Sequence, residues 1–207
     1  GPMTVNWKKM ADLTKKIADR VNKYETIKIE SGNGTSVIMS KKGRDAKIDT
    51  GIITKRGQFS NLPAGEVYFA PLEGSATGQL VIEWAPTRRL KSPVILYLDK
   101  GEVKKIEGSE QYIAYLEDKF SEKRANRNIA ELGIGTNNKA SRPDNILESE
   151  KILGTIHIAL GDNSSFGGNV QTSFHQDFVL FNPTVTLIDK DGDNKILMKN
   201  GKILLKY

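Results

Sequence analysis

Apolar residues recur at helical spacing in two stretches of the chain. Residues 6–24 carry one apolar stripe opposite lysines and acids, and Asn6 or Thr4 is suited to cap the N-terminus. Residues 109–123 repeat the pattern after Ser109, a second candidate cap. The stripes consist of Trp7, Met10, Leu13, Ile17, Val21 and Tyr24, and of Tyr112, Ile113, Leu116 and Phe120. We expect the first stripe to pack on the body of the domain or on a partner.

Elsewhere apolar and polar residues mostly alternate, which is the period of a strand with one buried face. Turn sequences such as Gly32-Asn33-Gly34 and Asp99-Lys100-Gly101 separate neighbouring strands and indicate hairpins. A further short helix is predicted over 144–153. The predicted strands are 26–30, 35–40, a short one within 41–58, 66–70, 79–84, 94–98, 102–106, 128–135, 155–160, and a final meander of 178–181, 184–188, 195–198 and 202–206.

The order of these elements predicts an α+β fold, mostly antiparallel or mixed sheet with a few flanking helices. At this length we expect residues 3–207 to form a single domain with a sizeable core. Gly1 and Pro2 ahead of Met3 resemble the residues that remain after an expression tag is cleaved, and we expect them to lie outside the domain.

The composition excludes several classes of function. The chain has no cysteine, which excludes disulfides and thiolate chemistry and fits a cytoplasmic protein. No apolar run is long enough to span a bilayer, so we expect no membrane partner. Residues 1–56 hold 13 Lys and Arg against 6 Asp and Glu, although the whole chain is only +6. Those lysines occur as isolated pairs without interleaved aromatic residues, which indicates a solvated surface rather than a nucleic-acid site.

Candidate chemistry gathers near the C-terminal end. His157 and His175 are the only histidines, and Asp177 lies two residues after the second, on the same side of an extended backbone. Glu66 and Glu131 stand in apolar strands, where a carboxylate is costly unless it is paired or bound to a metal. The alternatives are ordinary core or surface histidines, and an arginine partner for Glu131 such as Arg124, Arg127 or Arg142.

Four segments carry a family resemblance. They are Asn-Leu-Pro-Ala-Gly-Glu66-Val-Tyr, Ala-Glu131-Leu-Gly-Ile-Gly-Thr-Asn, Gly-Thr-Ile-His157-Ile-Ala-Leu-Gly and His175-Gln-Asp177-Phe. In order and approximate spacing they resemble the thermophilic leucyl aminopeptidases, a metallopeptidase family. The resemblance implies two divalent metal ions, with zinc or cobalt first and manganese or magnesium as other options. The implied ligands are Glu66, Glu131, His157, His175 and Asp177.

The same resemblance implies a hydrolase that removes N-terminal residues from a peptide or small amide substrate, working as a homodimer. Glu131 or Glu66 would act as the general base, with Glu73 as a further candidate. The alternatives are a metallohydrolase of another amide, and a family member that keeps metal but works as a binding or assembly module.

Two departures from the family pattern stand out. The family's tyrosine after the first histidine motif is absent, since Leu160–Ser165 contains none, and Asn163, Ser164 or a second metal ion would have to take its place. The family's peptidases are longer, with an N-terminal domain, and the chain begins near the start of their catalytic region, so we expect either an excised domain or a compact branch of the family.

Overall fold

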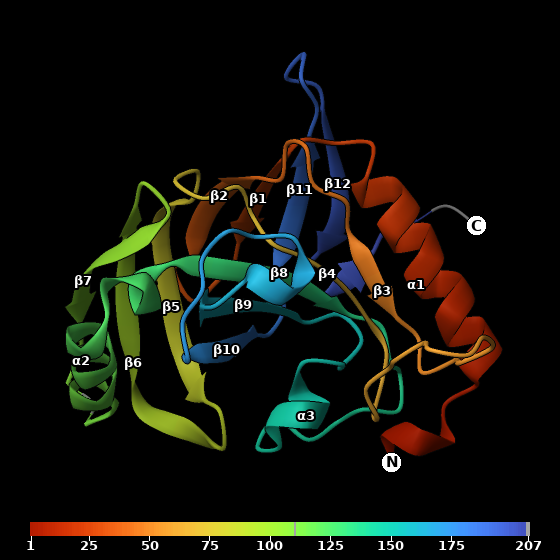
Figure 1. Ribbon diagram of the computed structural model, residues 1–207, viewed down its shortest axis with the longest axis horizontal. Coiled ribbons are helices and arrows are strands. Elements are labelled where there is room, and N and C mark those ends of the chain that lie inside the picture. The colour runs from red at the N-terminus through yellow and green to blue at the C-terminus, as the bar shows by residue number, and fades with distance from the viewer. Residues whose placement is uncertain (110, 206–207) are drawn as a thin grey trace.

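Two antiparallel sheets make up most of the protein, as the computed structural model shows (Figure 1). The structure describes residues 1–109 and 111–205; Glu110, in the predicted second helix, and Lys206 and Tyr207, at the predicted last strand, lie outside the described residues. Three α-helices flank the sheets within this part of the chain. The predicted α+β fold with mostly antiparallel sheet is confirmed.

The larger sheet has eight strands in the order β13-β12-β11-β1-β2-β5-β6-β7. At the predicted turn between β6 and β7, Lys100 and Gly101 both have positive φ, as a two-residue hairpin requires. The strands are β1 (Thr26–Glu30), β2 (Ser36–Ser40), β5 (Thr77–Ala85), β6 (Arg88–Asp99), β7 (Glu102–Glu107), β11 (Thr184–Ile188), β12 (Asn194–Lys199) and β13 (Lys202–Ile203).

The smaller sheet has five strands in the order β10-β9-β8-β4-β3, and Figure 1 shows it lying in front of the larger sheet. Every residue of β8 and β9 is buried, because these central strands are covered on both faces. The strands are β3 (Lys47–Asp49), β4 (Glu66–Phe69), β8 (Ile129–Gly135), β9 (Ile156–Gly161) and β10 (His175–Leu180).

The helices close the ends of this arrangement. Helix α1 (Trp7–Val21) lies beside β3, and Asn6 caps it by accepting a hydrogen bond from the Lys9 amide. Helix α2 (Tyr112–Glu122) lies at the opposite side beside β6 and β7, and α3 (Ile146–Ser149) is a single turn. Three 3₁₀ turns cover Pro2–Thr4, Arg124–Arg127 and Ser164–Phe166.

One hydrophobic cluster joins both sheets and both longer helices. It contains Ile17 and Val21 of α1, Leu116 and Phe120 of α2, and the inward residues of both sheets. Most of the apolar stripe of α1 therefore packs into the protein's own core. No helix among the described residues combines the length and the apolar character needed to cross a membrane.

Three local predictions were wrong. Residues 150–153 are not helical, because the backbone of Lys151 and Leu153 bonds to that of Asn137 instead of continuing α3. Ser109 does not cap α2, which begins at Tyr112; its hydroxyl bonds to that of Ser92. β10 pairs with β9, so the final meander contains only β11, β12 and β13.

Candidate metal centre

One face of the smaller sheet carries all five predicted metal-binding residues. Residues paired directly across an antiparallel sheet share a face, and so do residues two apart on a strand. On this rule Glu66 shares a face with Gly135, His157 with Gly133, and Asp177 with Ala159. Glu131 also pairs with Ala159, and His175 with Gly161. The structure thus brings together residues that are up to 111 positions apart, here 66 and 177.

The first group of side chains surrounds the imidazole of His157. Its Nε2 lies 3.4 Å from Glu66 Oε2 and 3.4 Å from Glu131 Oε1. His157 and Glu66 are buried, at 1% and 4% exposure, and Glu131 is 8% exposed. The three donor atoms lie within 4.8 Å of one another.

The second group surrounds the imidazole of His175. Its Nε2 lies 3.4 Å from Glu131 Oε2 and 3.4 Å from Asp177 Oδ2. Its other nitrogen, Nδ1, lies 2.8 Å from the Asp162 carbonyl oxygen and donates to it, so in the neutral imidazole Nε2 carries the lone pair that a metal ion needs. Glu131 therefore belongs to both groups, with one oxygen toward each imidazole.

These residues fit a divalent metal ion. The 3.4 Å separations exceed those of good hydrogen bonds, so the donors converge on shared points more than they bond to one another. Glu66 Oε2, which faces His157 Nε2, is buried without a hydrogen-bond partner, and this is costly unless a further group binds it. Imidazole nitrogens and carboxylate oxygens are the ligands that zinc and similar metals use.

Charge within the cluster shifts the pKa values of its members. Burial alone would lower the pKa of His157, but its bond to Glu131 and the charges of Glu66 and Asp177 raise it to about 9. His175 behaves alike, and Asp177 and Glu131 raise its pKa to about 11. Burial would raise the pKa of Glu131, yet both imidazoles lower it to about 2. For Glu66 burial prevails and raises the pKa.

The pocket over this face has a volume of about 390 Å³ and contains residues that the sequence did not single out. Lys151 donates to Glu66 Oε1 at 2.7 Å and to Glu150 Oε2 at 3.1 Å. Tyr68 follows Glu66 by two positions on β4 and so stands on the same face; its ring meets Phe166 edge-on. The other pocket-lining residues outside the five are Phe59, Asn61 and Ser165.

Only Tyr68 had a usable sequence signal, because the spacing of two from Glu66 on a strand places it on the site face. The sequence did not predict Lys151 and Glu150 as site residues, because the helix expected over 144–153 gives no reason to place them beside Glu66. Their approach depends on how that loop bonds to Asn137, a contact that no local pattern encodes.

The alternative arginine partners for Glu131 are wrong. Arg124 pairs with Glu102, Arg142 pairs with Asp144, and Arg127 donates to the Val103 carbonyl.

Glu73 does not reach the cluster. One carboxylate oxygen pairs with Arg44, and the other accepts from Asn163 Nδ2 and the Asn169 amide. Burial would raise its pKa, but these donors outweigh it and lower the pKa to about 2. Glu73 is therefore a structural tie rather than a general base, and the buried side chain of Asn163 is committed to it and to the Val170 amide.

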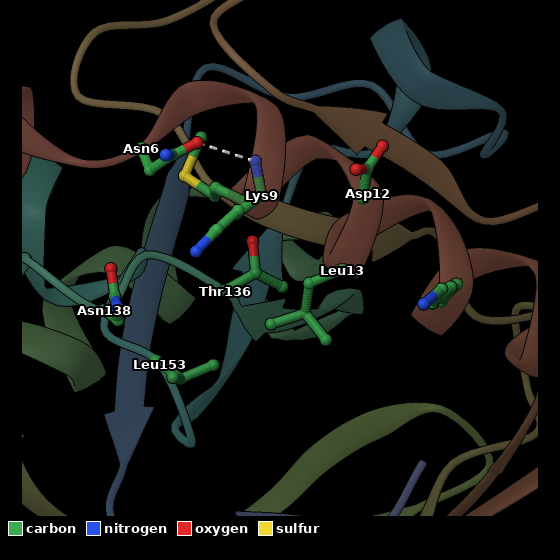
Figure 2. Close-up of a pocket in the computed structure, with 9 residues that line it drawn as sticks. Asn6, Lys9, Asp12, Leu13, Thr136, Asn138 and Leu153 are labelled. Carbon is green, nitrogen blue, oxygen red and sulfur yellow. Dashed lines mark hydrogen bonds between the residues drawn. The ribbon is translucent and has the colours of Figure 1, made fainter. Parts of the chain in front are cut away.

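A second hollow, of about 530 Å³, runs along α1 (Figure 2). Leu13 and Lys9 of α1 face Thr136, Asn138 and Leu153 across it. Asp12 is the one carboxylate among the residues that line it, so it lacks the donor set of the first pocket.

Fold and site together define a class: a two-sheet α+β domain whose carboxylate and imidazole groups can hold a metal ion. A family model described as NicX: 2,5-dihydroxypyridine 5,6-dioxygenase matches residues 4–204, and the chain belongs to this family. Among curated proteins none matches the chain.

Two solved structures share the fold. The 2,5-dihydroxypyridine dioxygenase of Pseudomonas putida KT2440 has a TM-score of 0.80 at 21% identity, with 94% of this chain and 60% of that chain covered. Wild-type AmpT of Thermus thermophilus has a TM-score of 0.70 at 16% identity, with 96% of this chain and 55% of that chain covered. The chain thus spans little more than half the length of these relatives. The resemblance to thermophilic leucyl aminopeptidases remains an interpretation of motifs, and the family shown is the NicX family.

Proposed function

We propose that the protein is a metal-dependent hydrolase of the aminopeptidase class, with two divalent ions held by Glu66, Glu131, His157, His175 and Asp177. The observation that carries this proposal is the position of Glu131, whose two oxygens face two different imidazoles at equal distance. A carboxylate shared by two groups of donors suits a pair of ions.

The protein's own residues would divide the work. His157 with Glu66, and His175 with Asp177, would each hold one ion, and Glu131 would bridge both. When bound, such ions supply an activated water and polarise the scissile carbonyl. Phe59, Tyr68 and Phe166 line the pocket beside these donors and would hold the apolar part of a peptide or small amide substrate.

The general base would be one of the carboxylates that line the site. Glu131 and Glu66 are the predicted candidates, but Glu131 faces both imidazoles and one oxygen of Glu66 is bonded to Lys151. Glu150 lines the pocket as well, and burial together with the charge of Asp177 raises its pKa to about 7, a value suited to proton transfer near neutral pH. Tyr68, on the site face of β4, would take the place of the absent family tyrosine as a hydrogen-bond donor.

A second candidate is a metal-dependent oxygenase that opens a dihydroxylated nitrogen heterocycle. Membership of the NicX family and the structural likeness to a 2,5-dihydroxypyridine dioxygenase favour it. Two imidazoles and one carboxylate suffice to hold a single non-haem iron with open positions. In this case His157, His175 and Glu131 would be the first choice of ligands, and the remaining acids would surround the ion.

Metal content and paired assays separate the two candidates. The chelator-treated protein is reloaded with zinc, cobalt or iron(II), and its metal content is measured by mass spectrometry. We expect two ions per chain and release of leucine from leucine amide with zinc or cobalt. Glu131→Gln should lower retention to one ion or fewer, whereas Glu102→Gln, which lies outside the pocket and pairs with Arg124, should keep both.

One iron per chain together with oxygen uptake on 2,5-dihydroxypyridine would favour the oxygenase. Metal retention without either activity would leave the binding or assembly module. No retention of any of the three metals would refute both enzymatic candidates. The predicted homodimer and the single domain over 3–207 are further proposals, tested by sedimentation velocity and by limited proteolysis.

A further inference from the structure

Lys151 is one of the least accessible charged groups in the protein. Its side chain is 4% exposed and lies against the carboxylate side chains of Glu66 and Glu150, which are 6% and 14% exposed. A buried ammonium is costly unless it is paired and hydrogen-bonded. Here two of its three protons are directed to carboxylate oxygens, at 2.7 and 3.1 Å.

The two oxygens of Glu66 have different surroundings. Oε1 accepts from Lys151 at 2.7 Å. Oε2 has no hydrogen-bond partner and lies 3.4 Å from His157 Nε2, on the side of the first group of donors. A carboxylate can bind a metal ion through one oxygen or through both, and an ammonium on one oxygen offsets the charge there and favours binding through the other.

We propose that Lys151 is a positioning residue that makes Glu66 a single-oxygen metal ligand. It holds Oε1 and turns Oε2 toward His157 and Glu131, so the ion beside His157 receives one oxygen from each carboxylate. Glu150 in turn fixes Lys151 from the other side. The inference rests on the proposed two-ion site, in which Glu66 is a ligand.

The test replaces Lys151 by methionine, which keeps the length of the side chain and removes its charge and donors. The matched control is Lys41→Met, because Lys41 is also 4% exposed and donates to a backbone carbonyl, that of Arg44, outside the pocket. Both variants lose a buried lysine, so both should lose thermal stability. Only Lys151→Met should change the metal site.

The readouts are cobalt(II) affinity by titration calorimetry and the visible absorption of the cobalt-loaded protein. We expect a roughly 10- to 100-fold loss of affinity at one of two sites in Lys151→Met, as for other groups that orient ligands. Its absorption should weaken, since a Glu66 that binds through both oxygens raises the coordination number. Lys151→Arg, which keeps charge and donors, should recover part of the loss.

A crystal structure of the zinc-loaded wild-type protein gives the same answer if Lys151→Met does not fold. We expect one Glu66 oxygen on the ion and the other on Lys151; binding through both oxygens would overturn the inference. Unchanged cobalt spectra and affinity in Lys151→Met would overturn it too and leave the proposed function standing. Failure of the wild-type protein to bind cobalt or zinc would refute the metal site itself.

Discussion

At the scale of single residues, the role of a side chain in this protein depends on its neighbours more than on its residue type. Glu131 and Glu73 are both glutamates with lowered pKa values, yet the donors differ. Glu73 is held by an arginine and amide groups, so its charge is fully used in tying loops together. Glu131 faces two imidazoles that a metal can replace as partners, which makes it the residue on which the proposed function depends.

The metal-free protein should lose stability as the pH rises from about 7 to 9. His157 has a pKa of about 9 when folded, above the ordinary value of 6.5, because nearby carboxylates outweigh burial. The folded state thus holds this proton more tightly, and the stabilisation is complete below about pH 6.5 and gone above about 9. At about 1.4 kcal/mol for each pKa unit, the loss in unfolding free energy is on the order of 3 kcal/mol.

Urea denaturation of chelator-treated protein across this pH range measures the loss. His157→Gln should make the fall between pH 7 and 9 less steep, because His157 no longer titrates and only His175, whose folded pKa is about 11, still contributes. A wild-type unfolding free energy that stays constant or rises between pH 7 and 9 would contradict the assigned charges.

At the scale of elements, strand β8 makes room for His157 because it has a glycine without a side chain at position 133. Gly133 pairs with His157 across the sheet, and a Cβ at Gly133 would overlap the imidazole ring at Cε1 and Nε2. The imidazole therefore lies over the glycine, which brings Nε2 to the two glutamates. Gly133 is thus required by its packing against His157 rather than by a turn.

We expect Gly133→Ala to displace His157 and to weaken metal binding at least tenfold, since no room exists for the added methyl group. Gly32→Ala is the control, because no atom lies within 4 Å of its added Cβ and its φ needs no glycine. Titration calorimetry with zinc compares the two. Equal affinity in Gly133→Ala and Gly32→Ala would show that the ring does not need this position.

For the whole molecule, the donors come from four neighbouring strands that share the core. Ions bound there connect β4, β8, β9 and β10 and are lost on unfolding, so metal binding and folding stability are linked. A free ion at 100 times its dissociation constant adds about 2.7 kcal/mol for one site.

Zinc or cobalt should therefore raise the melting temperature by roughly 5–11 °C for each site filled, given about 2–4 °C for each kcal/mol in a domain of this size. Differential scanning calorimetry of chelator-treated and reloaded protein measures the shift. Glu131→Gln should show a smaller one. A melting temperature that zinc and cobalt leave unchanged would speak against a site on these four strands.

The sequence by itself determined the elements and the candidate donors. Local periodicity predicted α1, the hairpins at Gly32-Asn33-Gly34 and Asp99-Lys100-Gly101, and the strands β8 and β9, although not their burial on both faces. Side-chain period and turn chemistry act over only a few residues. The five candidate ligands were found from rare histidines, acids in apolar strands and a family resemblance.

Only the tertiary structure decided which of these residues meet. It placed β10 beside β9 instead of β11, removed Glu73, Asn163 and the three arginines from the site, and brought in Lys151, Glu150 and Tyr68. Those outcomes depend on strand order and on one loop bonding to Asn137, which are contacts between distant parts of the chain. Pairing over such separations is set by the packing of the whole core, and no local pattern of residues contains it.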